Sequence, residues 1–142
     1  MDSASLLRER GLASWMAFTK TSEREVIGTL PSSHGVYVIL LGVSEPRRRG
    51  MSDIAYIGKA GNQNGLRGRV RQYYHPGPTQ RTSRAMNERL CAPGCVLRIG
   101  VLTTGSASEA ALLESELLDA FEREHEELPP HNRQRGRRLP KG

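Results

Sequence analysis

The sequence lacks the features that would place it in a membrane or in a secretory pathway. No apolar run approaches the roughly 18 residues that a membrane-spanning helix requires, and the opening MDSASLLRER carries an acid where a secretory signal carries bases. Hydrophobic residues make up 37% of the 142 residues and charged residues 25%, which is typical of a soluble globular protein. We therefore expect one cytoplasmic domain without a membrane partner.

Cysteine is also scarce. Cys91 and Cys95 form a single C-x3-C pair, and neither a second pair nor a nearby histidine completes a zinc site around them. Two reduced thiols beside a turn are the simpler interpretation. A disulfide is disfavoured by the cytoplasmic compartment that we expect.

Acidic residues are missing from parts of this basic chain, whose formal net charge is +6. Residues 47–98 contain eleven Lys or Arg and only two acids, and residues 131–142 contain five Lys or Arg and no acid. Residues 109–127 reverse the balance, with eight acids and one Arg. Charge runs are often only solvated surface, but this segregation favours a polyanionic partner such as a nucleic acid.

What the chain does contain is an alternation of strand and helix signals. Strands are expected at residues 35–41, 54–60 and 95–104, which are rich in β-branched or aromatic residues. Apolar spacing and two capping boxes, at Ser22 with Glu25 and at Ser106 with Glu109, predict helices. They are expected at residues 66–74, 78–90 and 106–125, with a short turn after Ser22 and one or two short helices carrying Leu6, Leu7, Leu12 and Trp15. Residues 42–53 have the Gly, Pro, Ser and Asp content of a loop, here a basic one.

The helix expected at residues 106–125 carries a carboxylate on its apolar side. The same-face neighbours of Glu114 are Ala110, Ala111, Leu117 and Leu118. A half-buried carboxylate is costly without a partner, so we expect an arginine or a metal ion beside it. The simpler alternative is that Glu114 lies at the edge of the apolar arc and reaches water or pairs with an arginine for structural reasons.

The four tyrosines fall in three short stretches, each beside glycine, lysine or arginine. Tyr37 and Tyr56 lie in two expected strands, where a tyrosine most often packs with its hydroxyl at the rim. Together with Lys59, Arg69 and Glu114, however, they form a set suited to phosphate-ester chemistry. A phenol near a cation can deprotonate water, a guanidinium can neutralise developing charge, and a carboxylate can hold a hard divalent ion.

Five motifs occur in order along the chain: GVY at 35–37, YIGKA at 56–60, LRGRVRQYYHP at 66–76, SEAALLESELL at 108–118 and PPHN at 129–132. Together they resemble the GIY-YIG nuclease superfamily over residues 34–132. The resemblance implies an α/β (α+β) fold with a small central three-stranded antiparallel sheet flanked by helices. Residues 1–33 would be a helical extension packed on this domain, and residues 133–142 a flexible basic tail. The implied activity is hydrolysis of DNA phosphodiester bonds with one divalent metal ion, Mg²⁺ or Mn²⁺.

The resemblance assigns roles to seven residues, which are Tyr37, Tyr56, Lys59, Arg69, Tyr73, Glu114 and Asn132. The two strand tyrosines would flank the scissile phosphate, with Tyr56 the better candidate for general base and Lys59 favouring its ionised form. Arg69 would contact the nonbridging oxygens, and Glu114 would be the single metal ligand from the protein. Asn132 would brace the site, and Tyr73 matches a further tyrosine of the excision-repair branch.

The implied partner is double-stranded DNA. Candidate DNA contacts are basic residues near the motifs and in the tail: Arg47, Arg48, Arg49, Arg67, Arg71, His75, Arg133 and Arg135. The loop expected at 42–53 separates the motif tyrosines further than in compact members of the superfamily. Such an addition could touch the duplex or could be only a solubilising surface turn. Cutting both strands would require a homodimer on DNA or two successive nicks.

Two other functions stay open at this stage. A nucleic-acid-binding module could keep the same fold without turnover, its basic segments binding phosphates regardless of sequence and more weakly at high salt. A nuclease directed at RNA would use the same groups. Metal-dependent nicking of a plasmid, and competition between substrates, would distinguish these alternatives.

Overall fold

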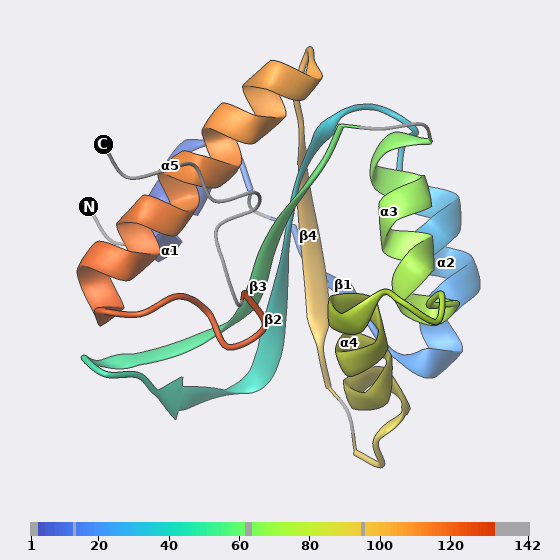
Figure 1. The fold of residues 1–142 in the computed structure, drawn as a ribbon, viewed down its shortest axis with the longest axis horizontal. Coiled ribbons are helices and arrows are strands. Elements are labelled where there is room, and N and C mark those ends of the chain that lie inside the picture. The colour runs from blue at the N-terminus through green and yellow to red at the C-terminus, as the bar shows by residue number, and fades with distance from the viewer. Residues whose placement is uncertain (1–2, 13, 62–63, 95, 133–142) are drawn as a thin grey trace.

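The computed structural model describes residues 3–12, 14–61, 64–94 and 96–132. Within them, a four-stranded antiparallel sheet is flanked by five α-helices (Figure 1). The strands lie in the order β1-β4-β2-β3 and are β1 (Met16–Ala17), β4 (Arg98–Thr103), β2 (Gly35–Pro46) and β3 (Met51–Ala60). The expected mixed class with an antiparallel sheet is confirmed. The expected number of three strands is wrong, because β1 adds a short fourth strand at the edge of β4.

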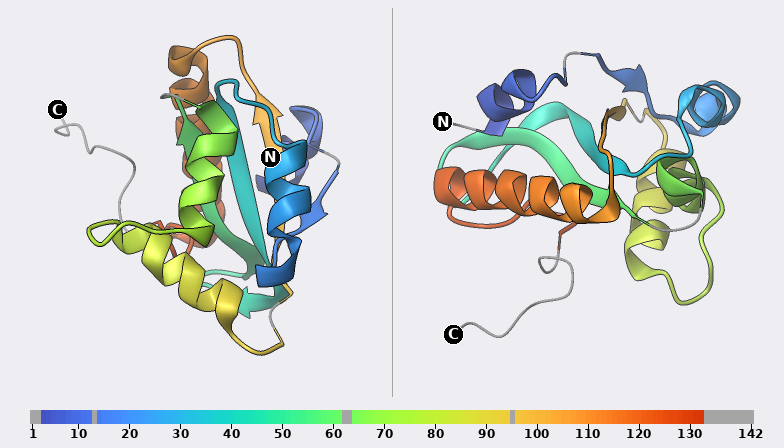
Figure 2. Two further views of the ribbon diagram at one scale, coloured as in Figure 1. Left: turned by 90° about the vertical axis from the view of Figure 1, so that its right-hand side faces the viewer. Right: turned by 90° about the horizontal axis from the view of Figure 1, so that it is seen from above.

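Helices cover both faces of the sheet (Figures 1 and 2). One face carries α1 (Ser3–Glu9) and α5 (Ala107–His125), and the other carries α2 (Glu23–Thr29), α3 (Gly65–Tyr74) and α4 (Arg81–Cys91). The helices expected at residues 66–74, 78–90 and 106–125 are therefore confirmed, with small shifts of their ends. No helix among the described residues is long and apolar enough to cross a membrane.

Strand β2 divides the apolar side chains between two cores. Tyr37 and Ile39 belong to the core beneath α3, whereas Val36 and Val38 belong to the core beneath α5. This alternation follows from the two-residue period of a strand. Because both faces are covered, residues 35–41 are all buried, and they appear in the sequence as a continuous apolar run.

The hairpin of β2 and β3 is longer than the sequence indicates. Strand pairing resumes beyond Leu40 at Glu45↔Ser52 and continues to Pro46↔Met51, so the prediction of a loop over residues 42–53 is largely wrong. A tight turn closes the hairpin, in which the Arg47 N–H donates to the Gly50 C=O at 2.9 Å. The polar composition misled the prediction, because the exposed end of a hairpin is held by backbone pairing and needs few apolar residues.

The N-terminal residues pass from one face of the sheet to the other. After α1 the chain runs along the edge of β4, where Met16 pairs with Ile99, and it then enters a 3₁₀ turn (Lys20–Ser22) and α2 (Figure 2). The expected one or two short helices are confirmed in part. Helix α1 carries Leu6 and Leu7 and is followed by Gly11 at φ +101°, whereas Leu12 and Trp15 lie outside any helix.

The two expected capping boxes differ in outcome. The Ser106 hydroxyl accepts a hydrogen bond from the Glu109 N–H at 3.1 Å, so the cap that opens α5 is confirmed. Ser22 does precede α2, but its hydroxyl does not cap that helix. It accepts the Thr19 N–H at 2.8 Å and donates to the Ala17 C=O at 3.0 Å, which secures the 3₁₀ turn instead.

Candidate active site

A cleft of about 550 Å³ opens beside the end of β3, between α3 and α5. Its wall comes from these three elements and the adjoining loop: Tyr56, Lys59, Ala60, Gly61, Asn64, Gly65, Gly68, Arg69, Gln72, Ala107 and Glu114. Seen from above in Figure 2, α3 and the N-terminal end of α5 lie on the two sides of β3. The fold thus brings Tyr56, Lys59, Arg69 and Glu114 into one cleft from three separate segments.

Two further tyrosines lie behind the cleft wall. Tyr37 and Tyr73 are fully buried, and their hydroxyl oxygens are 2.5 Å apart. The Tyr56 ring contacts both, with ring centroids 5.8 Å from Tyr37 and 6.3 Å from Tyr73. Among the described residues, the cleft wall includes Tyr56 but neither of the buried pair. The expectation is that Tyr37 and Tyr56 both flank a phosphate, but only Tyr56 lies on the cleft wall, and Tyr37 is buried behind it.

Gly58 makes the tyrosine cluster possible. It pairs with Tyr37 across the hairpin, and the Tyr37 ring lies over it. A Cβ at this position would lie 2.4 Å from the Tyr37 Oη and 2.5 Å from Cε2 of Tyr56. A side chain would therefore push the two rings apart, which explains the glycine of the YIG motif in physical terms.

Burial keeps the phenols of Tyr37 and Tyr73 protonated. Burial, the neighbouring phenol Tyr73 and then Tyr56 raise the pKa of Tyr37 well above its usual value. Burial and the neighbouring Tyr56 likewise raise the pKa of Tyr73, although Arg69 opposes the shift. Both phenols are therefore protonated at neutral pH and act as hydrogen-bonding groups. Of the three clustered phenols, Tyr56 is the one that is partly exposed to solvent.

Arg69 supplies positive charge at the rings. Its Cζ lies 5.4 Å from the centroid of the Tyr73 ring, and one terminal nitrogen donates a hydrogen bond to the side-chain oxygen of Gln72. Burial lowers the pKa of Arg69, but the phenolic oxygens of Tyr37, Tyr73 and Tyr56 outweigh that effect and the net shift is upward. The guanidinium therefore keeps its charge in the cleft.

Glu114 is buried as expected, with 9% of its surface exposed. Ala110, Leu117 and Leu118 are buried on the same side of α5, so its predicted place within the apolar arc is confirmed. The described residues contain no group of three or more His, Cys, Asp or Glu that could enclose a metal ion. An ion at Glu114 would take most of its ligands from water, which suits magnesium because that ion keeps several waters when bound. The carboxylate and the open cleft beside it fit a hydrated Mg²⁺ or Mn²⁺.

Asn132 binds the strand that carries Tyr56. Its side-chain oxygen accepts the Ile57 N–H at 2.9 Å, and its side-chain nitrogen donates to the Ile57 C=O at 2.9 Å. Both hydrogen bonds are buried. The predicted bracing residue is thus paired with the backbone next to Tyr56, despite the long spacer that separates Asn132 from α5.

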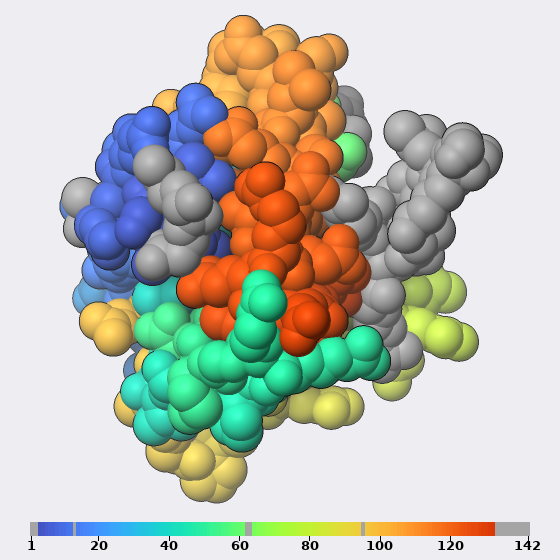
Figure 3. Space-filling view, turned by 90° about the vertical axis from the view of Figure 1, so that its left-hand side faces the viewer, coloured from blue at the N-terminus to red at the C-terminus, as the bar shows by residue number. Residues whose placement is uncertain are grey.

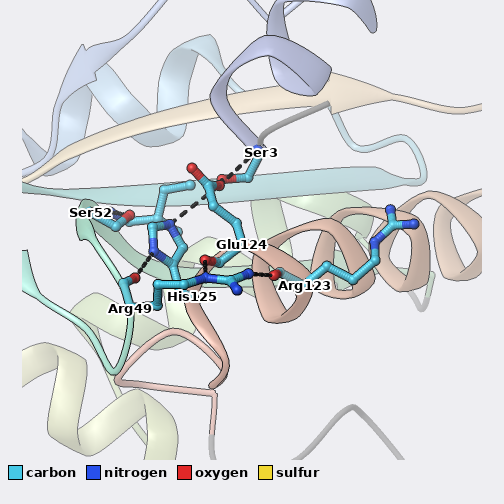
Figure 4. Close-up of polar contacts among 7 residues, drawn as sticks. Ser3, Arg49, Ser52, Arg123, Glu124 and His125 are labelled. Atoms are coloured by element: carbon cyan, nitrogen blue, oxygen red, sulfur yellow. Dashed lines mark hydrogen bonds and ion pairs between the residues drawn. The ribbon is translucent and has the colours of Figure 1, made fainter.

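The basic hairpin tip, by contrast, is bound to the far end of α5 (Figures 3 and 4). The Arg49 guanidinium donates hydrogen bonds to the backbone carbonyls of Arg123 and Glu124. The backbone carbonyl oxygen of Arg49 lies 2.8 Å from the His125 Nδ1. Arg48 is tied to the same end, because its N–H donates to the Glu127 carboxylate at 2.6 Å. Glu124 lies ten positions after Glu114 in α5, which is about 15 Å along the helix axis, so the hairpin tip is far from the cleft.

The other residues predicted to contact DNA differ in their partners and in their exposure. Arg47 lies 4.0 Å from Glu45, and the Arg67 Nε donates to the Leu30 C=O at 2.9 Å, so that side chain joins α3 to α2. Arg71 is exposed on α3, whereas His75 is paired with Glu23 at 2.5 Å. Arg133 and Arg135 lie outside the described residues, as does the rest of the basic tail.

The thiol pair is described only in part. Cys91 is exposed at the end of α4, with its sulfur 3.9 Å from the Asn87 side-chain oxygen. Cys95 lies outside the described residues. The interpretation of two reduced thiols stays a prediction.

Sequence reasoning missed two polar residues of the cleft, Gln72 and Asn64. Gln72 lies three residues after Arg69, which places both side chains on the same face of α3. The helical spacing would have been enough to find it. The cleft also includes Asn64, whose left-handed backbone at φ 68° begins α3 and has no comparable sequence signal.

The sequence matches no protein-family model and no curated protein. The resemblance to the GIY-YIG nucleases therefore stays a prediction that depends on the five motifs. What the cleft can do must be argued from its own residues.

Proposed function

We propose that this protein is a metal-dependent DNA endonuclease that hydrolyses phosphodiester bonds by direct attack of water. The observation that supports the proposal is that one cleft is lined by a phenol, two cationic side chains and a buried carboxylate. These groups belong to Tyr56, Lys59, Arg69 and Glu114. Each is a group that phosphate-ester hydrolysis uses, and a cleft beside an edge strand leaves room for a phosphodiester chain.

In this proposal Tyr56 removes a proton from the attacking water. It is the phenol on the cleft wall, and Arg69 and Lys59 line the same wall, so positive charge lies where a phenolate would form. The buried Tyr37 and Tyr73 stay protonated and hold the Tyr56 ring from behind.

Arg69 neutralises the charge that develops on the nonbridging oxygens of the phosphate. Its guanidinium is oriented by Gln72 and by the Tyr73 ring, so little reorganisation is needed when the substrate binds. Glu114 would hold a Mg²⁺ or Mn²⁺ ion together with water ligands. When bound there, such an ion supplies Lewis-acid stabilisation of the leaving 3′ oxygen.

The test is nicking of supercoiled plasmid in magnesium or manganese, with and without a chelator. Glu114→Gln should lower cleavage at least a hundredfold and leave DNA binding within about twofold, because a buried ligand is lost while the surface is unchanged. Glu122→Gln, on the exposed side of the same helix, is the matched control. Full cleavage by Glu114→Gln would refute the role of this carboxylate.

Two outcomes would favour the other functions. Binding of DNA without any metal-dependent product would indicate a nucleic-acid-binding module that lacks turnover. Faster cleavage of RNA than of DNA of the same sequence, or stronger competition by RNA, would indicate a nuclease directed at RNA.

The same assay tests the oligomeric state with DNA as the substrate. A rate of double-strand cutting that rises with the square of protein concentration would indicate a homodimer. Accumulation of nicked circles would indicate successive single cuts.

A further inference from the structure

Strand β3 contains an irregularity at the residue before Tyr56. Ile39 pairs with Tyr56 but the next residue, Leu40, pairs with Ile54, so Ala55 is an extra residue in β3. Ala55 and Tyr56 both pack against the core beneath α3, whereas neighbours in a regular strand face opposite ways. These are the features of a β-bulge, which bends a strand and re-aims a side chain.

The outer side of this bulge is bound by residues 129–132, which run back from α5 to the edge of the sheet (Figure 1). The His131 N–H donates to the Ala55 C=O at 3.0 Å, and Asn132 pairs with both backbone groups of Ile57. The edge of β3 is therefore hydrogen-bonded immediately before and immediately after Tyr56. The direction of the Tyr56 side chain depends on where His131 and Asn132 lie.

His131 is in turn held from α4. The Arg89 Nε–H donates to the His131 Nε2 at 2.9 Å, and Arg89 is only partly exposed. A continuous series of contacts thus runs from Arg89 through His131 and the Ala55 bulge to Tyr56. Arg89 does not itself line the cleft that carries Tyr56, Arg69 and Glu114.

We propose that Arg89 is a positioning residue for Tyr56, acting through His131 and the β3 bulge. The inference rests on the proposed function for its effect on catalysis, because there Tyr56 is the general base. Loss of the Arg89 contact removes its restraint on the His131 side chain, loosens the backbone hydrogen bond from His131 to Ala55 and lets the bulge relax. Tyr56 then spends less time in the productive orientation, while the surface that binds substrate is unchanged.

The kinetic test is a double-mutant cycle in the plasmid-nicking assay. Arg89→Met keeps the apolar stem and should lower kcat about tenfold with KM within about twofold, since small misplacements of a reacting group are costly. In a Tyr56→Phe background the same substitution should have no further effect, because it acts through that residue. Arg89→Lys keeps a donor and should stay within about threefold of the wild type. Arg81→Met, at the exposed start of α4, is the matched control.

A second readout does not depend on cleavage. In protein labelled with fluorotyrosine, Arg89→Met should shift or broaden the ¹⁹F resonance of Tyr56 and leave that of Tyr74 in place. The Tyr56 resonance is assigned with Tyr56→Phe.

The two measurements together separate the positioning role from the proposed function. If the wild type never cleaves but this shift appears, the proposed function fails and the positioning role stands. If the wild type cleaves while Arg89→Met changes neither kcat nor the Tyr56 resonance, the positioning role is refuted. A rise in KM with weaker salt dependence of DNA binding would also refute it, because Arg89 would then contact phosphate directly.

Discussion

Raising the pH above 10 should weaken the fold through the buried phenols of Tyr37 and Tyr73. Both side chains are 0% exposed and their pKa values are raised, whereas in the unfolded chain a tyrosine titrates near pH 10. Above that pH the unfolded state loses protons that the folded state keeps, so the free energy of unfolding falls as pH rises. Their contribution is fully present below about pH 10 and is lost on the way to the folded-state pKa values.

The size of this effect can be worked out per phenol. Each proton that is retained only in the folded state lowers the free energy of unfolding by about 1.4 kcal/mol per pH unit. Two buried phenols together contribute a slope of about 2.7 kcal/mol per pH unit. Tyr37→Phe removes one of them and should reduce the slope by about half of that amount. All other ionisable groups are shared by the wild type and the variant, so the difference in slope isolates the phenol of Tyr37.

The assay is urea unfolding followed by far-ultraviolet circular dichroism between pH 7 and pH 11. At pH 7 Tyr73→Phe should lose about 1–3 kcal/mol, because it leaves the buried Tyr37 hydroxyl without its partner at 2.5 Å. Tyr37→Phe should lose less, because the Tyr73 hydroxyl also hydrogen-bonds Tyr56. The double variant should be more stable than Tyr73→Phe, since the unpaired Tyr37 hydroxyl is then absent. Parallel loss of stability above pH 10 in the wild type and all three variants would refute the reasoning.

Three other substitutions probe contacts that stabilise the fold. Gly58→Ala places a methyl group 2.4 Å from the Tyr37 Oη and should lower the free energy of unfolding by about 1–3 kcal/mol, measured by urea titration. Arg49→Met removes donors to the C-terminal carbonyls of α5 and should cost about 1 kcal/mol without changing DNA affinity in a filter-binding assay. Asn132→Leu leaves the Ile57 N–H and C=O unpaired and should cost about 2–4 kcal/mol in the same urea titration, whereas unchanged stability would contradict the described contact.

The parts of the fold that the sequence predicted are those with strong local signals. Ser106 and Glu109 mark the start of α5, and the 3.6-residue period places Glu114 on its buried side. The run at residues 35–41 is uniformly apolar, because β2 is covered on both faces. In each case the residues that encode the feature lie within a few positions of one another.

The features that escaped prediction depend on contacts between distant segments. Strand β1 has two residues and exists because Met16 and Ala17 meet β4, not because of any propensity of their own. The Ala55 bulge is defined by a mismatch in pairing with β2, and its hydrogen bond to His131 spans more than seventy positions. The Ser22 hydroxyl had two competing partners, the start of α2 and the 3₁₀ turn, and a short motif could not tell which would win.

The same distinction applies to the cluster of Tyr37, Tyr56 and Tyr73. Sequence motifs treat Tyr37 and Tyr56 as a pair, because each lies in a strand beside a glycine, but packing gives them opposite environments. Tyr37 shares a hydrogen bond with Tyr73 in a fully buried position, where the cost of ionisation keeps it neutral. A general base must both reach water and lie near positive charge, and of the three only Tyr56 is on the wall with Lys59 and Arg69. The buried pair is better suited to fixing the Tyr56 ring, so removing their hydroxyls should affect stability more than chemistry.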